Sequence, residues 1–180
     1  RRDPRTGAKV SASHERRVYQ VTVLCLASFY KGPRFLEELA RQGCHIVLVT
    51  SQEVYNEPWP SCVQERFCLP KLDNVEEVRK AVGYLARKRD FAAVLPLDEY
   101  VVDICAWLRE HFRIQGMGVT QAARFRDKLY MRILAQEAGI PVPEFSAVLP
   151  YSRLEKFAKS VPAPWILKPR AESGSVKMRK

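Results

Sequence analysis

The sequence has no stretch apolar enough to cross a membrane and no secretion signal at its start. A membrane-spanning helix needs about 18 or more consecutive apolar residues, and charged residues interrupt every such window of this chain. The first four residues, Arg-Arg-Asp-Pro, include neither a methionine nor the apolar core of a signal peptide. We therefore expect a cytoplasmic protein with no membrane partner, and we interpret the chain as a fragment or as a start within a longer reading frame.

Metal-binding and disulfide patterns are also missing. The five cysteines form no C-x-x-C pair and have no histidine at zinc spacing. Cys25, Cys44 and Cys105 lie in apolar segments, where a cysteine is typically a small buried hydrophobe. Cys62 and Cys68 lie in a loop, and a bridge between them would need an oxidising compartment, so free thiols are favoured. The sequence predicts no metal site.

Composition and charge divide the chain into three parts. Its 180 residues are 47% apolar and 28% charged, which is typical of a globular protein with one large or two small domains. Residues 1–17 carry a net charge of +4, residues 18–119 carry −1 and residues 120–180 carry +7. We predict a disordered basic tail, an α/β domain and a second domain with these boundaries. A solvated tail is favoured over a nucleic-acid arm, and nucleic acid is not an expected partner, because no basic motif is interleaved with aromatic residues.

Apolar segments alternate with helical patterns in the middle part of the chain. Residues 18–26 and 45–50 are predicted to be strands buried on both faces, because nearly all of them are apolar. Residues 91–96 are the next predicted strand, and residues 67–69 a shorter one. No G-x-G-x-x-G motif follows the first strand, which argues against a dinucleotide-binding site. The alternation predicts an α/β fold with an open parallel, Rossmann-like sheet and with helices over about 33–42, 75–89 and 98–112.

Carboxylates follow one of the predicted strands at the expected ligand-binding edge. Asp98 and Glu99 come directly after the strand at 91–96, and ligands of open parallel sheets usually bind beyond the carboxyl ends of the strands. These two side chains can contact a cationic or hydroxylated ligand, or they can cap the next helix, which is worth up to about 1 kcal/mol. We favour the cap. The turns at 28–32 and 51–55 are expected at the same edge, either as surface turns or as ligand contacts.

A second unit of helices and strands is predicted from residue 120 onward. Thr120 is the expected N-cap of its first helix, and Gly139 is expected to end it. The apolar side chains of this helix, including Phe125 and Ile133, are expected to face a core. A capping box that begins at Ser152 predicts another short helix. The predicted elements are a helix over 120–138, a strand over 144–149, a helix from 152 to about 160, and a strand over 164–168.

Two lysines and a small-residue loop suggest a phosphate site in this second unit. Lys128 lies in the predicted helix that ends at Gly139, Lys168 ends a predicted strand, and Ser173, Gly174 and Ser175 follow. ATP carries about four negative charges, so its site needs fixed cations and many N–H donors. A loop of glycine and serine can turn its N–H groups toward phosphate while the lysines neutralise it. We favour this phosphate site over two unrelated surface lysines.

The same segment resembles a known family. The pattern Arg-Asp-Lys, Met-Arg and Gly-Ile-Pro-Val-Pro, joined to Leu-Lys-Pro-Arg, is similar to the nucleotide-binding half of ATP-grasp ligases. This family includes biotin carboxylase, carbamoyl-phosphate synthetase and D-alanine–D-alanine ligase. The resemblance runs from about Val18 to the end of the chain. It implies an α/β pre-ATP-grasp domain followed by an incomplete α+β ATP-grasp lobe.

The resemblance also implies roles for single residues. The residue matching Lys168 contacts the α- or β-phosphate of ATP in the family, and the residue matching Lys128 also reaches the phosphates. Arg170 would reach a phosphate or the acyl-phosphate. The loop matching Ser173, Gly174 and Ser175 folds over the β- and γ-phosphates. No residue of the chain is assigned to catalysis or to metal binding.

The implied activity is that of a larger enzyme. In the family, ATP activates a carboxylate as an acyl-phosphate, which an amine or thiol then attacks. The hinge that holds adenine and the side chains that hold Mg²⁺ lie further along than this chain extends, so we do not expect this chain alone to catalyse the reaction. We predict the N-terminal portion of such a ligase, with ATP as cofactor, Mg²⁺ in the full-length protein only, an unknown carboxylate substrate, and a homodimer left open. The alternative is a short non-catalytic binding or regulatory module derived from the same family.

Overall fold

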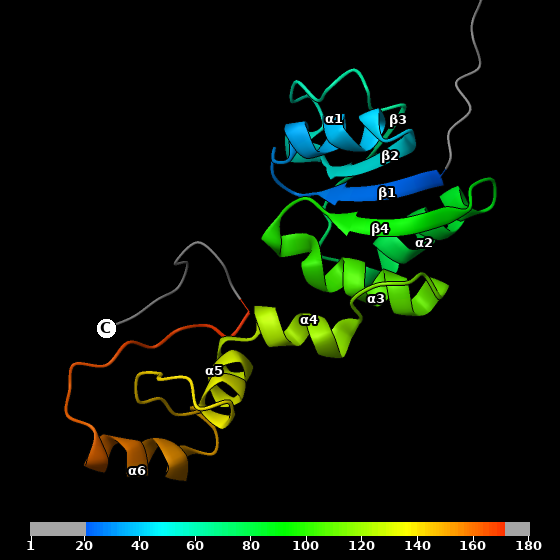
Figure 1. Ribbon diagram of the computed structural model, residues 1–180. Coiled ribbons are helices and arrows are strands. Elements are labelled where there is room, and N and C mark those ends of the chain that lie inside the picture. The colour runs from blue at the N-terminus through cyan, green and yellow to red at the C-terminus, as the bar shows by residue number, and fades with distance from the viewer. Residues whose placement is uncertain (1–20, 172–180) are drawn as a thin grey trace, which may run out of the picture.

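The computed structural model describes residues 21–171, which form one parallel sheet, its covering helices and a further helical unit (Figure 1). The predicted tail, the residues before Val21 and the predicted phosphate loop at Ser173, Gly174 and Ser175 lie outside the described residues. The elements are β1 (Val21–Ala27), α1 (Pro33–Arg41), β2 (Cys44–Ser51), η1 (Gln52–Val54), β3 (Glu65–Leu69), α2 (Val75–Ala86), β4 (Phe91–Pro96), η2 (Glu99–Val101), α3 (Val102–Phe112), α4 (Val119–Arg126), α5 (Lys128–Glu137) and α6 (Tyr151–Ser160).

The sheet confirms the parallel α/β prediction. Its strand order is β3-β2-β1-β4, and every pair is parallel. In the centre of the sheet, Leu24 of β1 lies between Val47 of β2 and Val94 of β4. Because β1 and β2 have neighbours on both edges and helices on both faces, they hold the most uniformly apolar segments of the chain.

Two hydrophobic cores lie on opposite faces of the sheet. Successive residues of a strand point to opposite faces, so Leu24 and Leu26 of β1 pack against α2 and α3, while Val23 and Cys25 pack against α1. Figure 1 shows α1 on one side of the sheet, and α2 and α3 on the other. Apolar side chains of α2 and α3 complete the first core; they include Val78, Val82, Leu85, Ile104, Cys105 and Leu108.

The five cysteines are free, as predicted. Cys25, Cys44 and Cys105 are buried, while Cys62 is half-buried and Cys68 is exposed. Burial raises the pKa of the Cys25 thiol to about 12 and also raises that of Cys105. Both thiols therefore stay protonated and behave as small core hydrophobes.

A buried arginine fixes the corner between α3 and α4. The Arg109 side chain donates from Nε and Nη2 to the carbonyl oxygen of Val94 at 2.9 and 2.6 Å, and from Nη1 to that of Met117 at 2.9 Å. Val94 belongs to β4, an edge strand of the sheet. Gly116 has a φ of +134°, and a Cβ there would lie 2.9 Å from Cδ of Arg109. The corner therefore depends on the close approach of a glycine to this guanidinium side chain.

The predicted helix over 120–138 is wrong in one respect, because it is two helices. The chain becomes extended at Asp127, with φ −88° and ψ 106°, which separates α4 from α5. The Asp127 carboxylate accepts hydrogen bonds from the N–H groups of Leu129 and Tyr130, so it ends one helix and caps the next. Thr120 is not the N-cap either, since α4 begins at Val119 after Gly118.

The strands predicted at 144–149 and 164–168 do not form within the described residues. The first segment is irregular, and the second contains a single isolated bridge residue, Leu167. An isolated strand is not stable without a neighbour to pair with, and neither segment has a partner strand among residues 21–171. Ser152 does not begin a capping box, because α6 starts after Pro150 without a side-chain cap.

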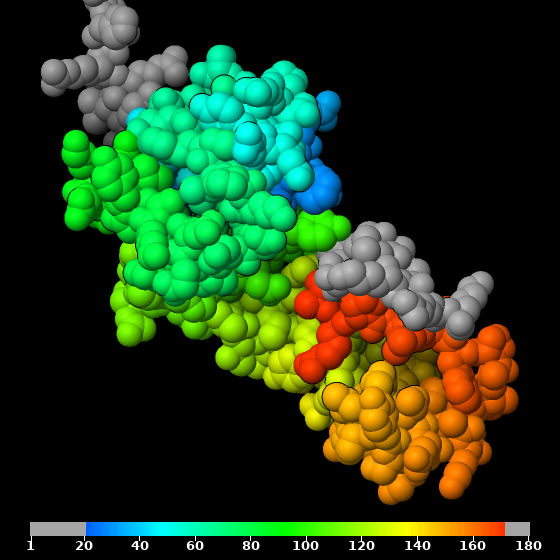
Figure 2. Space-filling view, turned by 180° about the vertical axis from the view of Figure 1, so that it is seen from behind, coloured from blue at the N-terminus to red at the C-terminus, as the bar shows by residue number. Residues whose placement is uncertain are grey.

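The unit formed by α5 and α6 has little core of its own. Neither helix contains a buried residue. The prediction that Phe125 and Ile133 face a core is wrong, because they are 66% and 36% exposed. Figure 2 shows the residues after α4, coloured yellow to red, extending away from the sheet. The predicted domain boundaries stay a prediction.

Candidate nucleotide-phosphate site

Three consecutive residues at the junction of α4 and α5 hold a segment that lies more than forty positions later. The N–H group of Lys128 donates to the carbonyl oxygen of Arg170 at 2.9 Å. Nη2 of Arg126 donates to the carbonyl oxygen of Ala171 at 2.7 Å. Between these contacts, the Asp127 carboxylate accepts hydrogen bonds from Nε and Nη2 of Arg170. The start of α5 is thereby fixed against the residues that follow Lys168.

The Asp127 carboxylate has two tasks. It caps α5, and it forms a bidentate ion pair with Arg170. The Asp127 side chain is 18% exposed, whereas that of Arg170 is 65% exposed. The hydrogen bond from Arg170 lowers the pKa of Asp127, and the N–H groups of Tyr130 and Leu129 lower it further, so the group is a carboxylate at neutral pH. The same contact raises the pKa of Arg170.

Arg126 ties this junction to the sheet. Its side chain is only 7% exposed and lies 2.8 Å from Oε1 of Glu99 and 3.4 Å from Oδ2 of Asp103. Glu99 lies in η2 and Asp103 in the first turn of α3, directly after the carboxyl end of β4. One guanidinium thus bridges two carboxylates of the sheet unit and the carbonyl oxygen of Ala171. Glu99, for which we weighed a ligand contact, is an ion-pair partner in this structure.

Asp98 joins two loops at the same edge of the sheet. Its carboxylate accepts from the N–H of Ser28 at 2.6 Å, the hydroxyl of Ser28 at 2.8 Å, the N–H of Phe29 at 3.1 Å and the N–H of Tyr100 at 3.0 Å. The rings of Phe29 and Tyr100 stack at 5.0 Å. The bond to Tyr100 confirms the predicted cap, although the capped element is the 3₁₀ turn η2. Four donors occupy this buried carboxylate, so its role is to hold the loops after β1 and β4 together.

Lys128 and Lys168, which are predicted to bind phosphate, belong to the two segments that the contact between Lys128 and Arg170 joins. Lys128 is the first residue of α5 and is half-buried, whereas Lys168 is exposed two residues before Arg170. The structure therefore brings the backbone of the Lys128 region and the residues after Lys168 together. Arg170 is also there, but its guanidinium contacts Asp127. Sequence reasoning missed Arg126 and Asp127; the available signal was a carboxylate set between two cations.

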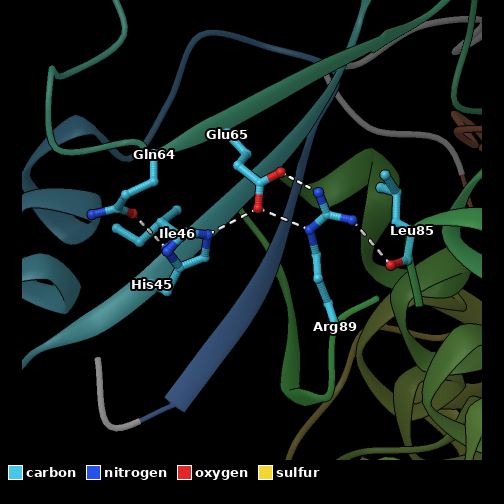
Figure 3. Close-up of polar contacts among 6 residues, drawn as sticks. All are labelled: His45, Ile46, Gln64, Glu65, Leu85 and Arg89. Atoms are coloured by element: carbon cyan, nitrogen blue, oxygen red, sulfur yellow. Dashed lines mark hydrogen bonds and ion pairs between the residues drawn. The ribbon is translucent and has the colours of Figure 1, made fainter. Parts of the chain in front are cut away.

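A second polar cluster lies at the opposite end of the strands, where β2 and β3 begin (Figure 3). The carboxylate of Glu65 lies 2.9 Å from Nε2 of His45 and accepts two hydrogen bonds from Arg89, whose Nη1 donates to the carbonyl oxygen of Leu85. The bonds from Arg89 and His45 lower the pKa of Glu65 to about 2. His45, Glu65 and Arg89 border an open pocket of about 600 Å³ at the amino ends of the strands. Their charges satisfy one another, so the cluster holds β2, β3 and the end of α2 together.

Neither a metal centre nor a membrane helix is found in the described part of the chain. Within residues 21–171, no group of three or more His, Cys, Asp or Glu side chains is placed to hold a metal ion. None of the described helices is long and apolar enough to cross a bilayer.

Several solved structures share this fold. The L-amino acid ligase from Bacillus licheniformis matches with a TM-score of 0.69 at 18% identity, over 86% of this chain and 38% of that enzyme. The biotin carboxylase domain of Hydrogenobacter thermophilus 2-oxoglutarate carboxylase, solved as a dimer with MgADP, ADP and bicarbonate, matches with a TM-score of 0.69 at 18% identity, over 88% and 36%. N5-carboxyaminoimidazole synthetase from Staphylococcus aureus, complexed with ADP, has a TM-score of 0.63 and 19% identity, over 87% and 39%.

These matches are matches of structure. No family model and no curated protein sequence matches the chain. The chain spans 38% of the ligase and 36% of the carboxylase domain, well under half of either. All three neighbours are ATP-grasp enzymes. The chain has the mixed α/β fold of the N-terminal part of ATP-grasp enzymes.

Proposed function

We propose that this chain is the N-terminal portion of an ATP-dependent ligase of the ATP-grasp type, and that Lys128 and Lys168 bind the phosphates of ATP. The observation that supports the proposal is the contact between the start of α5 and the segment after Lys168, through the N–H of Lys128 and the carbonyl oxygen of Arg170. Lys128, the first residue of α5, and Lys168, two residues before Arg170, would supply the compact charges that a triphosphate needs.

The proposed reaction is the activation of a carboxylate as an acyl-phosphate, followed by attack of an amine or thiol. A carboxylate oxygen forms a bond to the γ-phosphorus of ATP, and the bond from this phosphorus to ADP breaks. The amine or thiol then attacks the acyl carbon, phosphate leaves with the C–O bond electrons, and the nucleophile loses a proton. Mg²⁺ would accompany ATP and neutralise the phosphoryl oxygens; no residue of this chain is assigned to it. Ser173, Gly174 and Ser175 are proposed to cover the outer phosphates. A cytoplasmic location belongs to the same proposal.

The ion pair with Asp127 suggests another role for Arg170. A guanidinium paired with a carboxylate attracts phosphate less than an unpaired guanidinium does, because the pair has no net charge. Arg170 contacts Asp127 through both Nε and Nη2. We therefore assign the attraction for phosphate to the two lysines, and a different role to Arg170.

Lys168→Ala tests the proposal. In the protein produced from its native gene, we expect the variant to bind Mg-ATP at least about tenfold more weakly, a loss of about 1.4 kcal/mol. Lys159→Ala is the matched control, because it removes an exposed lysine of α6 from the same unit. A fluorescent-nucleotide titration measures both. Unchanged affinity in Lys168→Ala would remove this lysine from the site.

The intact mass of that protein separates the ligase from the alternative. A mass well above the 20.7 kDa of this chain supports the ligase. A mass near 20.7 kDa together with nucleotide binding supports the short binding module, which keeps a phosphate site without catalysis.

A further inference from the structure

Asp127 lies where a phosphate site least favours a carboxylate. It caps α5 immediately before Lys128, and its N–H bonds come from Leu129 and Tyr130. A negative charge at this helix start repels phosphate and uses N–H groups that an anion would otherwise bind. Its presence next to a proposed phosphate-binding lysine therefore needs a compensating function.

The contacts on both sides of Asp127 show what that function is. Arg126, Asp127 and Lys128 bind Arg170 and Ala171 through a carbonyl contact, an ion pair and a second carbonyl contact. The ion pair is the only side-chain contact among the three that joins two charges directly. It fixes the position along the chain at which the segment from Lys168 to Ala171 meets α5.

We propose that Asp127 and Arg170 are positioning residues of the nucleotide site, which hold Lys168 at a fixed place relative to Lys128 and do not themselves contact ATP. This inference rests on the proposed function. In this proposal the guanidinium of Arg170 is paired with the Asp127 carboxylate, and the two lysines bind the phosphates. The bidentate contact supplies a direction as well as attraction, which a single lysine at position 170 would not.

Asp127→Asn separates positioning from capping. Asparagine caps a helix about as well as aspartate, so the variant keeps α5 and removes the charge of the pair. Arg170→Gln removes the pair from the other side. Arg41→Gln is the matched control, because Arg41 forms the same bidentate contact with Glu38 on α1, outside the proposed site.

Each single variant is expected to bind Mg-ATP about three- to fivefold more weakly, as for loss of a partly exposed ion pair of up to about 1 kcal/mol. The double variant is expected to bind Mg-ATP about as tightly as the single variant with the lower affinity, because both changes break the same Asp127–Arg170 pair. The urea unfolding midpoints of these variants should change no more than that of Arg41→Gln. A loss of affinity for Mg-ATP then reports on the site and not on folding.

Three results would overturn the proposal. Tighter ATP binding by Asp127→Asn would mean that Asp127 withholds Arg170 from phosphate. Additive losses in the double variant would mean that Arg170 contacts ATP directly. Unchanged amide hydrogen exchange at Lys128 in both single variants, measured without nucleotide, would mean that the pair does not hold the segment. If the unaltered protein binds no ATP, the proposed function fails, while the exchange measurement still reports on the pair.

Discussion

The loss of Arg109 should cost this fold much more than the loss of an exposed polar side chain. It is 7% exposed, and it donates three hydrogen bonds to the carbonyl oxygens of Val94 and Met117. Methionine has an unbranched, flexible side chain and no donor. Arg109→Met therefore keeps most of the packing volume and leaves both carbonyl groups without their guanidinium donors.

The magnitude follows from those two carbonyl groups. Leaving a buried acceptor unpaired costs about 1–3 kcal/mol, so the two together cost about 2–6 kcal/mol. Removing a buried charge and burying an apolar side chain offset part of this cost. We expect a net loss of about 3 kcal/mol in the free energy of unfolding, and a decrease in Tm of about 6–12 °C for a chain of this size.

Urea and thermal unfolding followed by circular dichroism measure this loss. Arg79→Met is the control, because the Arg79 side chain is 34% exposed and pairs with Glu76 on the surface of α2; such a change costs less than about 1 kcal/mol. Arg109→Lys should fall between the two, since an ammonium can reach one carbonyl group but not both with a fixed fork. A loss below about 1 kcal/mol in Arg109→Met would refute the reasoning, because the corner would then be held by other contacts.

Two further results are expected. Asp98→Ala removes the acceptor for four hydrogen bonds and should lower the free energy of unfolding by about 2–4 kcal/mol, whereas Asp73→Ala, at an exposed position, should change it by less than about 0.5 kcal/mol. The pKa of Glu65 is lowered from 4.5 to about 2, so its stabilisation is present above pH 4.5 and is lost as the pH falls toward 2. Glu65→Gln should therefore lose less stability than the unaltered protein between about pH 5 and about pH 3 in urea titrations; equal losses would contradict the role of this carboxylate.

The sheet unit could be predicted because its sequence and its burial agree. β1 and β2 are apolar on both faces, and in the structure both faces are covered. Asn74 lies before an amphipathic segment and caps α2 through the N–H groups of Glu76 and Glu77. Local pattern and tertiary packing favour the same elements there, which is the condition under which sequence reasoning succeeds.

The unit after α4 could not be predicted to the same extent, for a physical reason. An apolar pattern at helical or strand spacing shows that a side chain is able to pack, but not that a partner is present. Phe125 lies on α4 with two thirds of its surface exposed, and the segment at 144–149 pairs with no strand among residues 21–171. The break at Asp127 was missed because helix propensities differ only slightly between residues. An aspartate side chain that accepts hydrogen bonds from the following N–H groups can outweigh them and start a new helix.

The charges of the junction bear on the role expected for Arg170. A phosphate site requires cations, so every lysine and arginine near the predicted loop was a candidate. A cation is available to a ligand only to the extent that no carboxylate holds it, and Asp127 holds Arg170 while Glu99 and Asp103 hold Arg126. Sequence order gives the number of cations in a segment, but ion pairs between residues 27 or 43 positions apart decide how many serve the ligand. The acids that come with a basic segment are therefore as informative about its function as the bases.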